Sequence, residues 1–373
     1  MSTESDDNGL LRSVLPPERV DQLFDLCGAH GWKLILASAV VGALPPLFGL
    51  REGYMMTVIS EMFLFAILAL SWDIVGGQTG YPSFGNMAFF GIGAYTGAIL
   101  LKDFAVSFPL AVVSAGVFAT VFAAIIGLIV LRLRGHYFAI ATLGVLLAAQ
   151  QISRNLEITG GASGKILFDV PPGVVFYYFF LGVLVAEIIV VYYLSSTRFG
   201  FILNAIRDDE GKATAMGFNT TYYKTAAWML AALFTGLAGG AYGLFNTFID
   251  PQTAYNGAWN VELIAMALMG GTGTVAGPVI GAFGLHTVIE YVETAFVGWQ
   301  LVMLGLAVIV TVIGFPKGVV GTLREYANEM DYYERGGMAA TDAAADGSGG
   351  SDVAASTTDA ADSDADTEVT RDE

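Results

Sequence analysis

The amino-acid sequence predicts an all-α integral membrane protein, a polytopic helical bundle of about eight to ten spans with broken glycine-rich helices. Hydrophobic residues make up 55% of the 373 positions and charged residues 14%, against about 25% charged in soluble domains. Mean hydropathy is +0.62 over the whole chain, although its last part is polar. Apolar segments close to the ~20 residues of a transmembrane helix recur along the sequence. These values argue against a soluble protein.

The apolar segments place most of the spans directly. Residues 85–101 are also apolar but rich in glycine, and residues 258–292 are long enough for two short crossings with a glycine break at 270–273. We therefore expect a transmembrane domain over residues 32–325. The clear candidates for spans are 32–50, 54–75, 108–131, 137–153, 174–194, 225–248 and 298–316.

The two ends of the chain differ from this apolar centre. Residues 1–31 open with acidic residues and contain no signal-peptide cleavage site, so a cytoplasmic segment is expected. Within it, residues 17–28 predict an amphipathic helix that lies on the membrane surface or packs as an ordinary helix. Residues 326–373 form an acidic C-terminal tail, which from 338 onward holds ten acids and one base. Such a composition predicts disorder.

Charge sets the expected orientation and excludes some partners. Lysine and arginine gather in short cytoplasmic loops. With a cytoplasmic N-terminus and a crossing at 85–101, eleven of them lie inside and four outside, so both termini are predicted to be cytoplasmic. The formal net charge of −17 excludes a nucleic-acid binder, and its acidic excess indicates a halophilic source.

The sequence carries no pattern for catalysis. The single cysteine, Cys27, excludes an intramolecular disulfide, and three scattered histidines argue against a histidine-based metal centre. Nucleophile elbows and dinucleotide fingerprints are missing from the sequence. We therefore expect no catalytic residue, no metal and no cofactor, and the chain is not expected to be an enzyme.

A polar loop over residues 195–224 predicts two short helices at the cytoplasmic surface. Asp208 can cap the second of these helices, Gly217 can end it, and Asn219 can cap the following span. A simple connector would be shorter. The loop is either a docking element for a cytoplasmic partner or a solvated loop with good caps.

Glycine-rich breaks at 76–86 and 270–278 interrupt the apolar segments. Broken helices at membrane depth are tolerated only inside protein or along a wet cavity. Glycines four residues apart, as at Gly93 and Gly97 or Gly236 and Gly240, instead indicate close helix packing. One break in each half of the chain favours a transport pathway.

Acidic residues within spans leave a second hypothesis open, an ion-coupled secondary transporter. Glu61 and Glu187 are the most deeply placed of them, and a hydrogen-bonded structural carboxyl is the alternative interpretation of each. The remaining members of this acidic set are Asp73, Glu262 and Glu290.

Several motifs resemble the membrane permeases of branched-chain amino acid ABC importers, of the LivM type. The resemblance covers roughly residues 54–318. Its motifs are Ala205–Glu210 followed by Ala213 and Ala215–Asn219, Leu237–Tyr242, Gly270–Thr274, Gly277–Ala282, Phe89–Tyr95, Tyr137–Leu143 and Thr159–Gly164. The sequence departs from the family at Tyr81–Asn86, where a Gln-Leu-Ser-x-Gly-His run is common. Permeases for urea or short amides are closely similar, so they remain an alternative.

The resemblance implies a multi-pass permease subunit in the cell membrane that forms half of a solute pathway. Its implied partners are membrane lipid, a second permease subunit of the LivH type, two cytoplasmic ATPase subunits that hydrolyse the ATP, and an extracellular solute-binding protein. The loop 195–224 would then be the coupling loop.

The same resemblance assigns expected roles to residues. Ile206, Ala213 and Met216 would contact the ATPase as apolar residues. The full set for ATPase coupling is Ile206, Arg207, Asp208, Asp209, Glu210, Ala213, Met216 and Gly217. The pathway candidates are Gly80, Ser83, Asn86, Thr272, Gly273, Thr274 and Gly277.

Overall fold

The computed structural model describes residues 53–168 and 170–295, and after them only positions 302, 305, 306, 309 and 318. The chain divides into two units, Met1–Glu325 and Tyr326–Glu373, and every described residue belongs to the first. The predictions for residues 1–31, 32–50 and 326–373, and for most of 298–316, lie outside the described residues.

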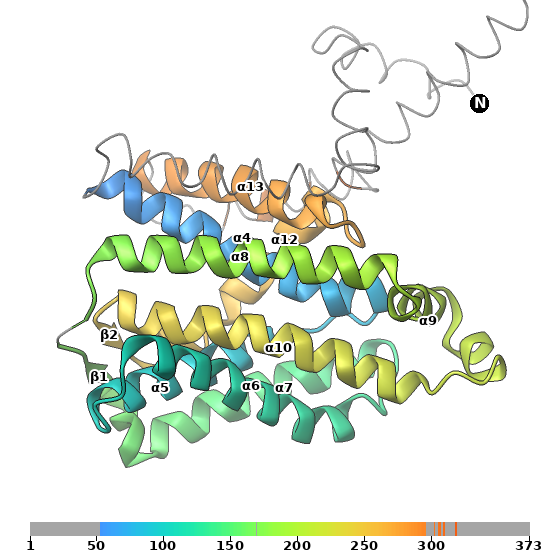
Figure 1. The fold of residues 1–373 in the computed structure, drawn as a ribbon, viewed down its shortest axis with the longest axis horizontal. Helices are drawn as coiled ribbons and strands as arrows, with labels where there is room; N and C mark the ends of the chain where they lie inside the picture. Colours follow the sequence, from blue (N-terminus) through green and yellow to red (C-terminus); the bar gives the residue numbers. More distant parts are fainter. Residues whose placement is uncertain are drawn as a thin grey trace, which may run out of the picture. The chain divides into compact units, whose positions relative to one another are not determined.

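The described part is a bundle of α-helices with one short two-stranded ribbon (Figure 1), which confirms the all-α prediction. Two 3₁₀ turns, Glu157–Thr159 and Gly161–Ser163, precede the ribbon, in which Lys165 lies opposite Ile249. The elements are α4 (Tyr54–Thr79), α5 (Asn86–Lys102), α6 (Phe108–Val130), α7 (His136–Asn155), β1 (Lys165–Ile166), α8 (Gly173–Ser196), α9 (Arg198–Ala215), α10 (Thr220–Phe245), β2 (Phe248–Ile249), α11 (Pro251–Ala254), α12 (Gly257–Gly270) and α13 (Ala276–Ala295).

Four of the described helices, α4, α6, α8 and α10, are long and apolar enough to cross a membrane. On α6 and α8, large apolar side chains stay exposed along the helix, as expected for surfaces that meet lipid rather than water, whereas α4 and α10 are mostly buried. On α6 these exposed residues are Leu110, Val113, Val117, Phe118, Val121, Ile125, Leu128 and Ile129.

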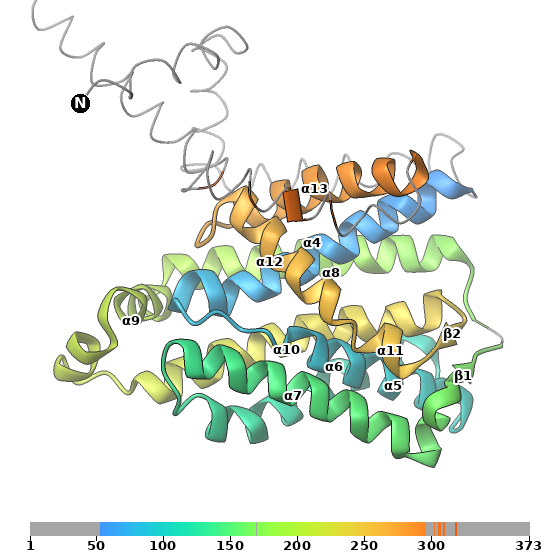
Figure 2. The same ribbon diagram turned by 180° about the vertical axis from the view of Figure 1, so that it is seen from behind.

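The connections between the helices gather at two opposite ends of the bundle. Helix α9 lies at one end, together with the connections 80–85, 131–135 and 271–275, and we call this the α9 end (Figures 1 and 2). Strands β1 and β2 lie at the opposite end, the β end. Helix α12 leads toward the α9 end and α13 returns from it, so the segment 258–292 forms two helices on either side of the glycine break. The 14 residues of α12 extend about 21 Å, too short to cross a bilayer alone.

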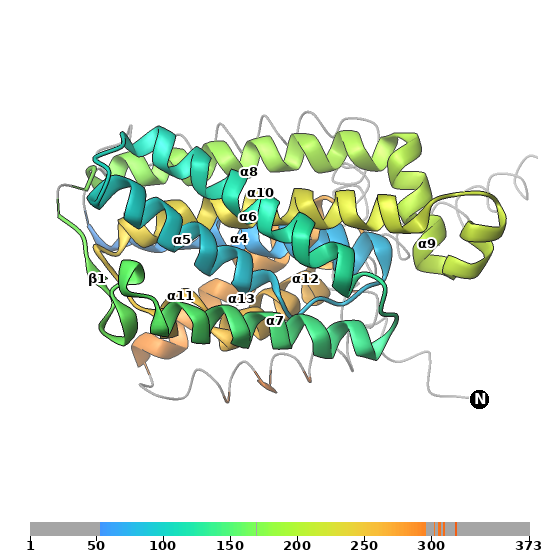
Figure 3. The same ribbon diagram turned by 90° about the horizontal axis from the view of Figure 1, so that it is seen from below.

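Helix α10 occupies the centre of the bundle and packs against α4, α5, α6 and α8 (Figure 3). Glycine makes the closest of these contacts possible. A Cβ atom on Gly93 of α5 would lie 2.3 Å from the carbonyl oxygen of Gly236, and one on Gly239 would lie 2.2 Å from that of Phe90. The four-residue glycine spacing therefore marks a backbone-to-backbone interface, as predicted.

The first glycine break is shorter than the sequence indicates. Helix α4 continues through Gly76 and Gly77 and ends at Thr79, so only residues 80–85 are non-helical. A Cβ atom on Gly76 would lie 2.5 Å from the ring of Trp72, and one on Gly77 would lie 2.7 Å from the backbone nitrogen of Gly273. These two glycines serve close packing inside a helix, which composition alone does not distinguish from a break.

The interface between α5 and α10 gives a direct test of this packing. Gly93→Ala should lower the apparent unfolding midpoint of the purified protein in detergent, because overpacking costs about 1–3 kcal/mol. Gly182→Ala on α8 is the matched control, since a Cβ atom there meets nothing within 4 Å. Its midpoint should stay level or rise. Equal midpoints for both variants would contradict the close contact.

Candidate functional site

The two glycine-rich breaks meet at the α9 end of the bundle. The carboxylate of Asp73, buried in α4, accepts a hydrogen bond from the backbone N–H of Gly273 at 2.8 Å. Gly273 has a φ of +76° and Gly271 a φ of +114°, conformations that favour glycine. The break between α12 and α13 is therefore anchored on α4, six residues before α4 itself ends at Thr79.

Arg207 joins α9 to both breaks. Its Nη1 donates a hydrogen bond to the carbonyl oxygen of Gly77 at 3.2 Å. A Cβ atom on Gly273 would lie 2.8 Å from the same Nη1, and one on Gly80 would lie 2.9 Å from the Arg207 Cγ. The positive charge of Arg207 also acts on the buried carboxyl of Asp73. We call Asp73, Gly77, Arg207 and Gly273 the break junction.

Helix α9 is bent at Asp209, whose φ of −164° and ψ of 105° are not helical. Asp209 Oδ1 accepts the backbone N–H of Lys212 at 3.0 Å, so Asp209 caps the second half of α9. The backbone hydrogen bond from Lys212 is the main cause that lowers the pKa of Asp209. The prediction that Asp208 provides this cap was wrong by one residue.

The caps at the far side of α9 match the predictions. Gly217 ends the helix with a φ of +89°, and the N–H of Phe218 bonds to the carbonyl of Ala213 at 3.2 Å. This is the usual geometry of a glycine C-cap. The side chain of Asn219 then accepts the N–H of Tyr222 at 3.2 Å and caps α10.

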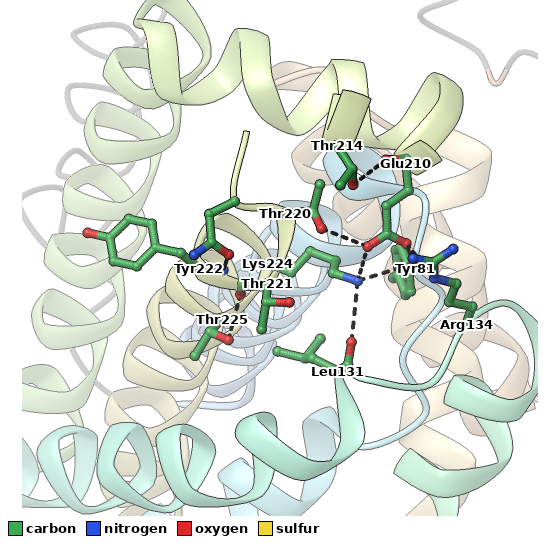
Figure 4. A network of polar contacts seen from close by, with 11 residues as sticks. Tyr81, Leu131, Arg134, Glu210, Thr214, Thr220, Thr221, Tyr222, Lys224 and Thr225 are labelled. Atoms are coloured by element: carbon green, nitrogen blue, oxygen red, sulfur yellow. Dashed lines mark hydrogen bonds and ion pairs between the residues drawn. The ribbon is translucent and has the colours of Figure 1, made fainter. Parts of the chain in front are cut away.

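Glu210 is the centre of a second polar cluster, the Glu210 network (Figure 4). Its Oε1 lies 2.6 Å from Lys224 Nζ and accepts Thr220 Oγ1 at 3.0 Å. Its Oε2 accepts the hydroxyl of Tyr81 and lies 3.3 Å from Arg134 Nε. The network therefore ties α9 to α10, to the first break and to the connection between α6 and α7.

Lys224, like Glu210, makes several polar contacts within this network. Its Nζ also donates to the carbonyl of Leu131 and to the hydroxyl of Tyr81, both at 3.3 Å, and lies 4.4 Å from the centre of the Tyr81 ring. The Lys224 side chain is 3% exposed and that of Glu210 11%. Burial raises the pKa of Glu210, but hydrogen bonds from Lys224 and Tyr81 outweigh it, so the pKa lies below its ordinary value.

Two of the three apolar residues expected to contact an ATPase point inward. Ile206 is 2% exposed and Ala213 1%, and both belong to the hydrophobic core. Met216, by contrast, is 66% exposed. The apolar face of α9 with Ile206 and Ala213 packs on the bundle itself, so of the three only Met216 is exposed; the coupling role of these residues stays a prediction. The outward face carries Asp208, Lys212 and Met216, and each is exposed.

The pathway candidates divide by environment. Gly80 and Gly273 lie against Arg207, whereas Thr272 is exposed. Three others shape the turns: Ser83 Oγ accepts the N–H of Gly85 at 3.1 Å, and Thr274 Oγ1 accepts that of Gly277 at 3.0 Å. Asn86 differs from all of these.

Asn86 begins α5 and is 1% exposed, yet neither polar atom of its side chain has a hydrogen-bond partner in the described part of the chain. A buried amide without partners is uncommon, and in this Asn86 differs from the other pathway candidates, whose role stays a prediction.

The acidic residues within the spans take different roles. Glu187 is fully buried and accepts Ser71 Oγ at 2.6 Å, as expected for a hydrogen-bonded structural carboxyl. Glu61 is only half-buried and lines a small cavity. Glu187 is not among the residues that line this cavity.

Sequence reasoning did not assign a site role to Asp73, Tyr81, Arg134 or Lys224. Asp73 gave one usable signal, a carboxylate next to a glycine break. For the other three, only the fold brings them to Glu210, since Tyr81 and Lys224 lie 143 positions apart.

The Glu210 network predicts strong coupling between its two buried charges. Lys224→Met leaves Glu210 without its main partner, which costs about 3–5 kcal/mol in comparable buried pairs and should lower the unfolding midpoint in detergent. Glu210→Gln combined with Lys224→Met should recover much of the loss. Lys212→Met, on the exposed side of α9, is the control and should change little.

The direction of the pKa shift of Glu210 predicts how the stability of the protein depends on pH. Because the pKa of Glu210 is lowered in the folded protein, its stabilisation is present above the ordinary glutamate pKa and is lost as the pH falls through the lowered value. In the variant experiment described before, additive effects of the single variants, with no recovery in the double variant, would contradict the coupling between Glu210 and Lys224.

Comparison with known proteins identifies the family of the chain. Residues 54–312 match the family described as the branched-chain amino acid transport system permease component. The high-affinity branched-chain amino acid transport system permease proteins LivM of Salmonella typhimurium and Escherichia coli are each 26% identical over 324 residues, covering 78% of this chain and 76% of theirs.

A probable branched-chain amino acid transport permease protein LivM of Methanocaldococcus jannaschii is 24% identical over 261 residues, 58% of this chain and 75% of that protein. No solved structure matches the chain significantly. Because the family match spans more than half of the 373 residues and contains both breaks, α9 and the polar contacts between them, the chain belongs to the permease components of branched-chain amino acid transport systems.

Proposed function

We propose that this chain is the transmembrane permease subunit of an ABC importer for branched-chain amino acids, forming half of the solute pathway. The partners in this proposal are a second permease subunit of the LivH type, two cytoplasmic ATPase subunits and an extracellular solute-binding protein. The LivM relatives named above support the solute class through their own names.

The break junction is the observation that carries this proposal. Arg207 sits on α9 and bonds to Gly77 beside one break, while its guanidinium packs against Gly273 in the other. A force applied to α9 would therefore reach both breaks at once. The Glu210 network adds a second attachment, which holds the part of α9 after the bend at Asp209 to the start of α10. Such rigid attachment is what a coupling element requires.

The surface that an ATPase would contact is the exposed face of α9. Asp208, Lys212 and Met216 are all exposed; Asp208 lies just before the bend at Asp209, Lys212 in the second half of α9 and Met216 at its C-cap. This face replaces the apolar contact set expected from sequence. Gly217 keeps the turn after it narrow through its left-handed backbone.

Charge supports a cytoplasmic position for the α9 end. Among the described residues, this end carries most of the basic side chains of the connections. Those at the α9 end are Arg132, Arg134, Arg198, Arg207, Lys212 and Lys224. Those toward the β end are Lys102, Arg154 and Lys165, and Lys165 is paired with Asp103 at 2.5 Å. The β end would face the binding protein.

The decisive experiment is uptake into proteoliposomes that contain the assembled complex. Radiolabelled leucine and the binding protein are supplied outside, with ATP inside, and proton and sodium gradients are varied separately from ATP. Leucine should accumulate only with ATP and binding protein, and collapse of either gradient should leave uptake unchanged.

Vesicles with a hydrolysis-deficient ATPase serve as the control for leakage. Parallel assays with urea and acetamide separate the solute classes, and neither should accumulate. Uptake that follows an ion gradient without ATP would contradict the proposal, and accumulation of urea or acetamide in place of leucine would contradict the solute class.

A further inference from the structure

A small cavity lies away from the break junction, where α4 and α13 meet α10 and α12. Its volume is about 100 Å³, room for an ion with a few water molecules. It combines acidic, imidazole and aromatic side chains, and no lysine or arginine is among its described lining residues. The lining residues are Glu61, Phe65, Tyr242, Trp259, Glu262, His286, Ile289 and Glu290.

Three of these side chains offer ligand atoms to a common point. Glu61 comes from α4, whereas His286 and Glu290 are one turn apart on α13 and share its inner face. One ligand atom from each residue lies within 4.8 Å of the other two. Ligands of a tetrahedral zinc ion are about 3.4 Å apart, so a small rotation of the glutamate side chains would close the set.

His286 supplies an independent observation. Its ring is 4% exposed, and neither Nδ1 nor Nε2 has a hydrogen-bond partner among the described residues. Phe65 fixes the ring plane, with ring centroids 4.8 Å apart and planes inclined by 30°. A buried imidazole without partners is unfavourable, and coordination of a cation through its nitrogen lone pair removes that penalty.

We propose that Glu61, His286 and Glu290 bind one divalent transition-metal cation of the zinc class. An imidazole ligand favours zinc and its neighbours over magnesium and calcium, which prefer oxygen ligands alone. Two carboxylates balance the double positive charge. The site is separate from the break junction, because none of the junction residues is among the residues that line this cavity.

Neighbouring groups complete the site. The hydroxyl of Tyr54 donates to Glu290 Oε1 at 2.5 Å, a contact that orients the carboxylate as outer-sphere partners of metal ligands do. Phe65 and Trp259 stack edge to face at 5.3 Å and form an apolar wall. The three scattered histidines made a histidine centre improbable from sequence. One histidine is enough here because the fold adds carboxylates from two helices.

The position of the site gives it a mechanical consequence. Helix α4 ends at one break and α13 begins at the other, so both helices leave this cavity and lead to the break junction. A bound cation would clamp α4 to α13 at their far ends. Such a cation would not restrain the two helices at the α9 end, where the breaks lie.

The test measures metal binding by the full-length protein in detergent, purified with an affinity tag that contains no histidine. After removal of metals with a chelator, the protein is dialysed against micromolar Zn²⁺ and bound metal is counted by mass spectrometry. About one zinc ion per chain is expected. His286→Asn and Glu61→Gln should each weaken binding at least about tenfold.

Exposed residues of the same types provide matched controls. His136→Asn and Glu157→Gln should leave zinc binding unchanged, because both side chains are exposed and remote from the cavity. Zinc should also raise the unfolding midpoint of the wild-type protein and of these controls, and should not raise that of the site variants. Excess Mg²⁺ or Ca²⁺ should not displace the zinc.

Several outcomes would overturn the proposal: no stoichiometric zinc at micromolar concentration, unchanged binding in the site variants, or displacement by Mg²⁺ or Ca²⁺. If His286→Asn does not yield a monodisperse protein, Glu61→Gln and Glu290→Gln carry the test. The measurement uses no transport readout, so its failure and the failure of the proposed importer function are separate results.

Discussion

The hydrogen bond from the Gly273 N–H to the Asp73 carboxylate joins the break between α12 and α13 to helix α4, and the arrangement of the α9 end depends on it. Asp73 is fully buried and Gly273 is half-buried, so a carboxylate without a hydrogen-bond donor would be strongly unfavourable at this position. The bond fixes the break between α12 and α13 against α4. Gly77 must lack a side chain for this approach, and Arg207 then covers the pair from α9.

A second buried charge cluster controls how α9 sits on this junction. Glu210 and Lys224 are both largely removed from water, so each is unfavourable without the other. Their pairing explains why the inward face of α9, with Ile206 and Ala213, stays in the core while Met216 remains outside. The break junction and the Glu210 network act at the same end of the bundle, and together they make α9 an attached element rather than a loop.

Much of the fold could be predicted from sequence because hydrophobic length and glycine chemistry are local signals. The helices at 108–130, 136–155 and 173–196 agree with predicted spans within two residues, and Gly217 and Asn219 cap as expected. The site was less predictable. Asp73 and Gly273 are 200 positions apart, and no local pattern states that they meet. Short helix signals also do not reveal the kink at Asp209 or the burial of Ile206 against the bundle.

In the importer proposed above, α9 and the breaks move together through Arg207, and amide hydrogen exchange can detect this motion. Exchange in 198–217 and 271–275 is compared with and without ATP in the assembled complex, for the wild type and for Arg207→Met. We expect ATP to change exchange in both segments of the wild type, and Arg207→Met to keep the change in α9 but lose most of it at 271–275. An unaltered response at 271–275 in Arg207→Met would contradict this expectation.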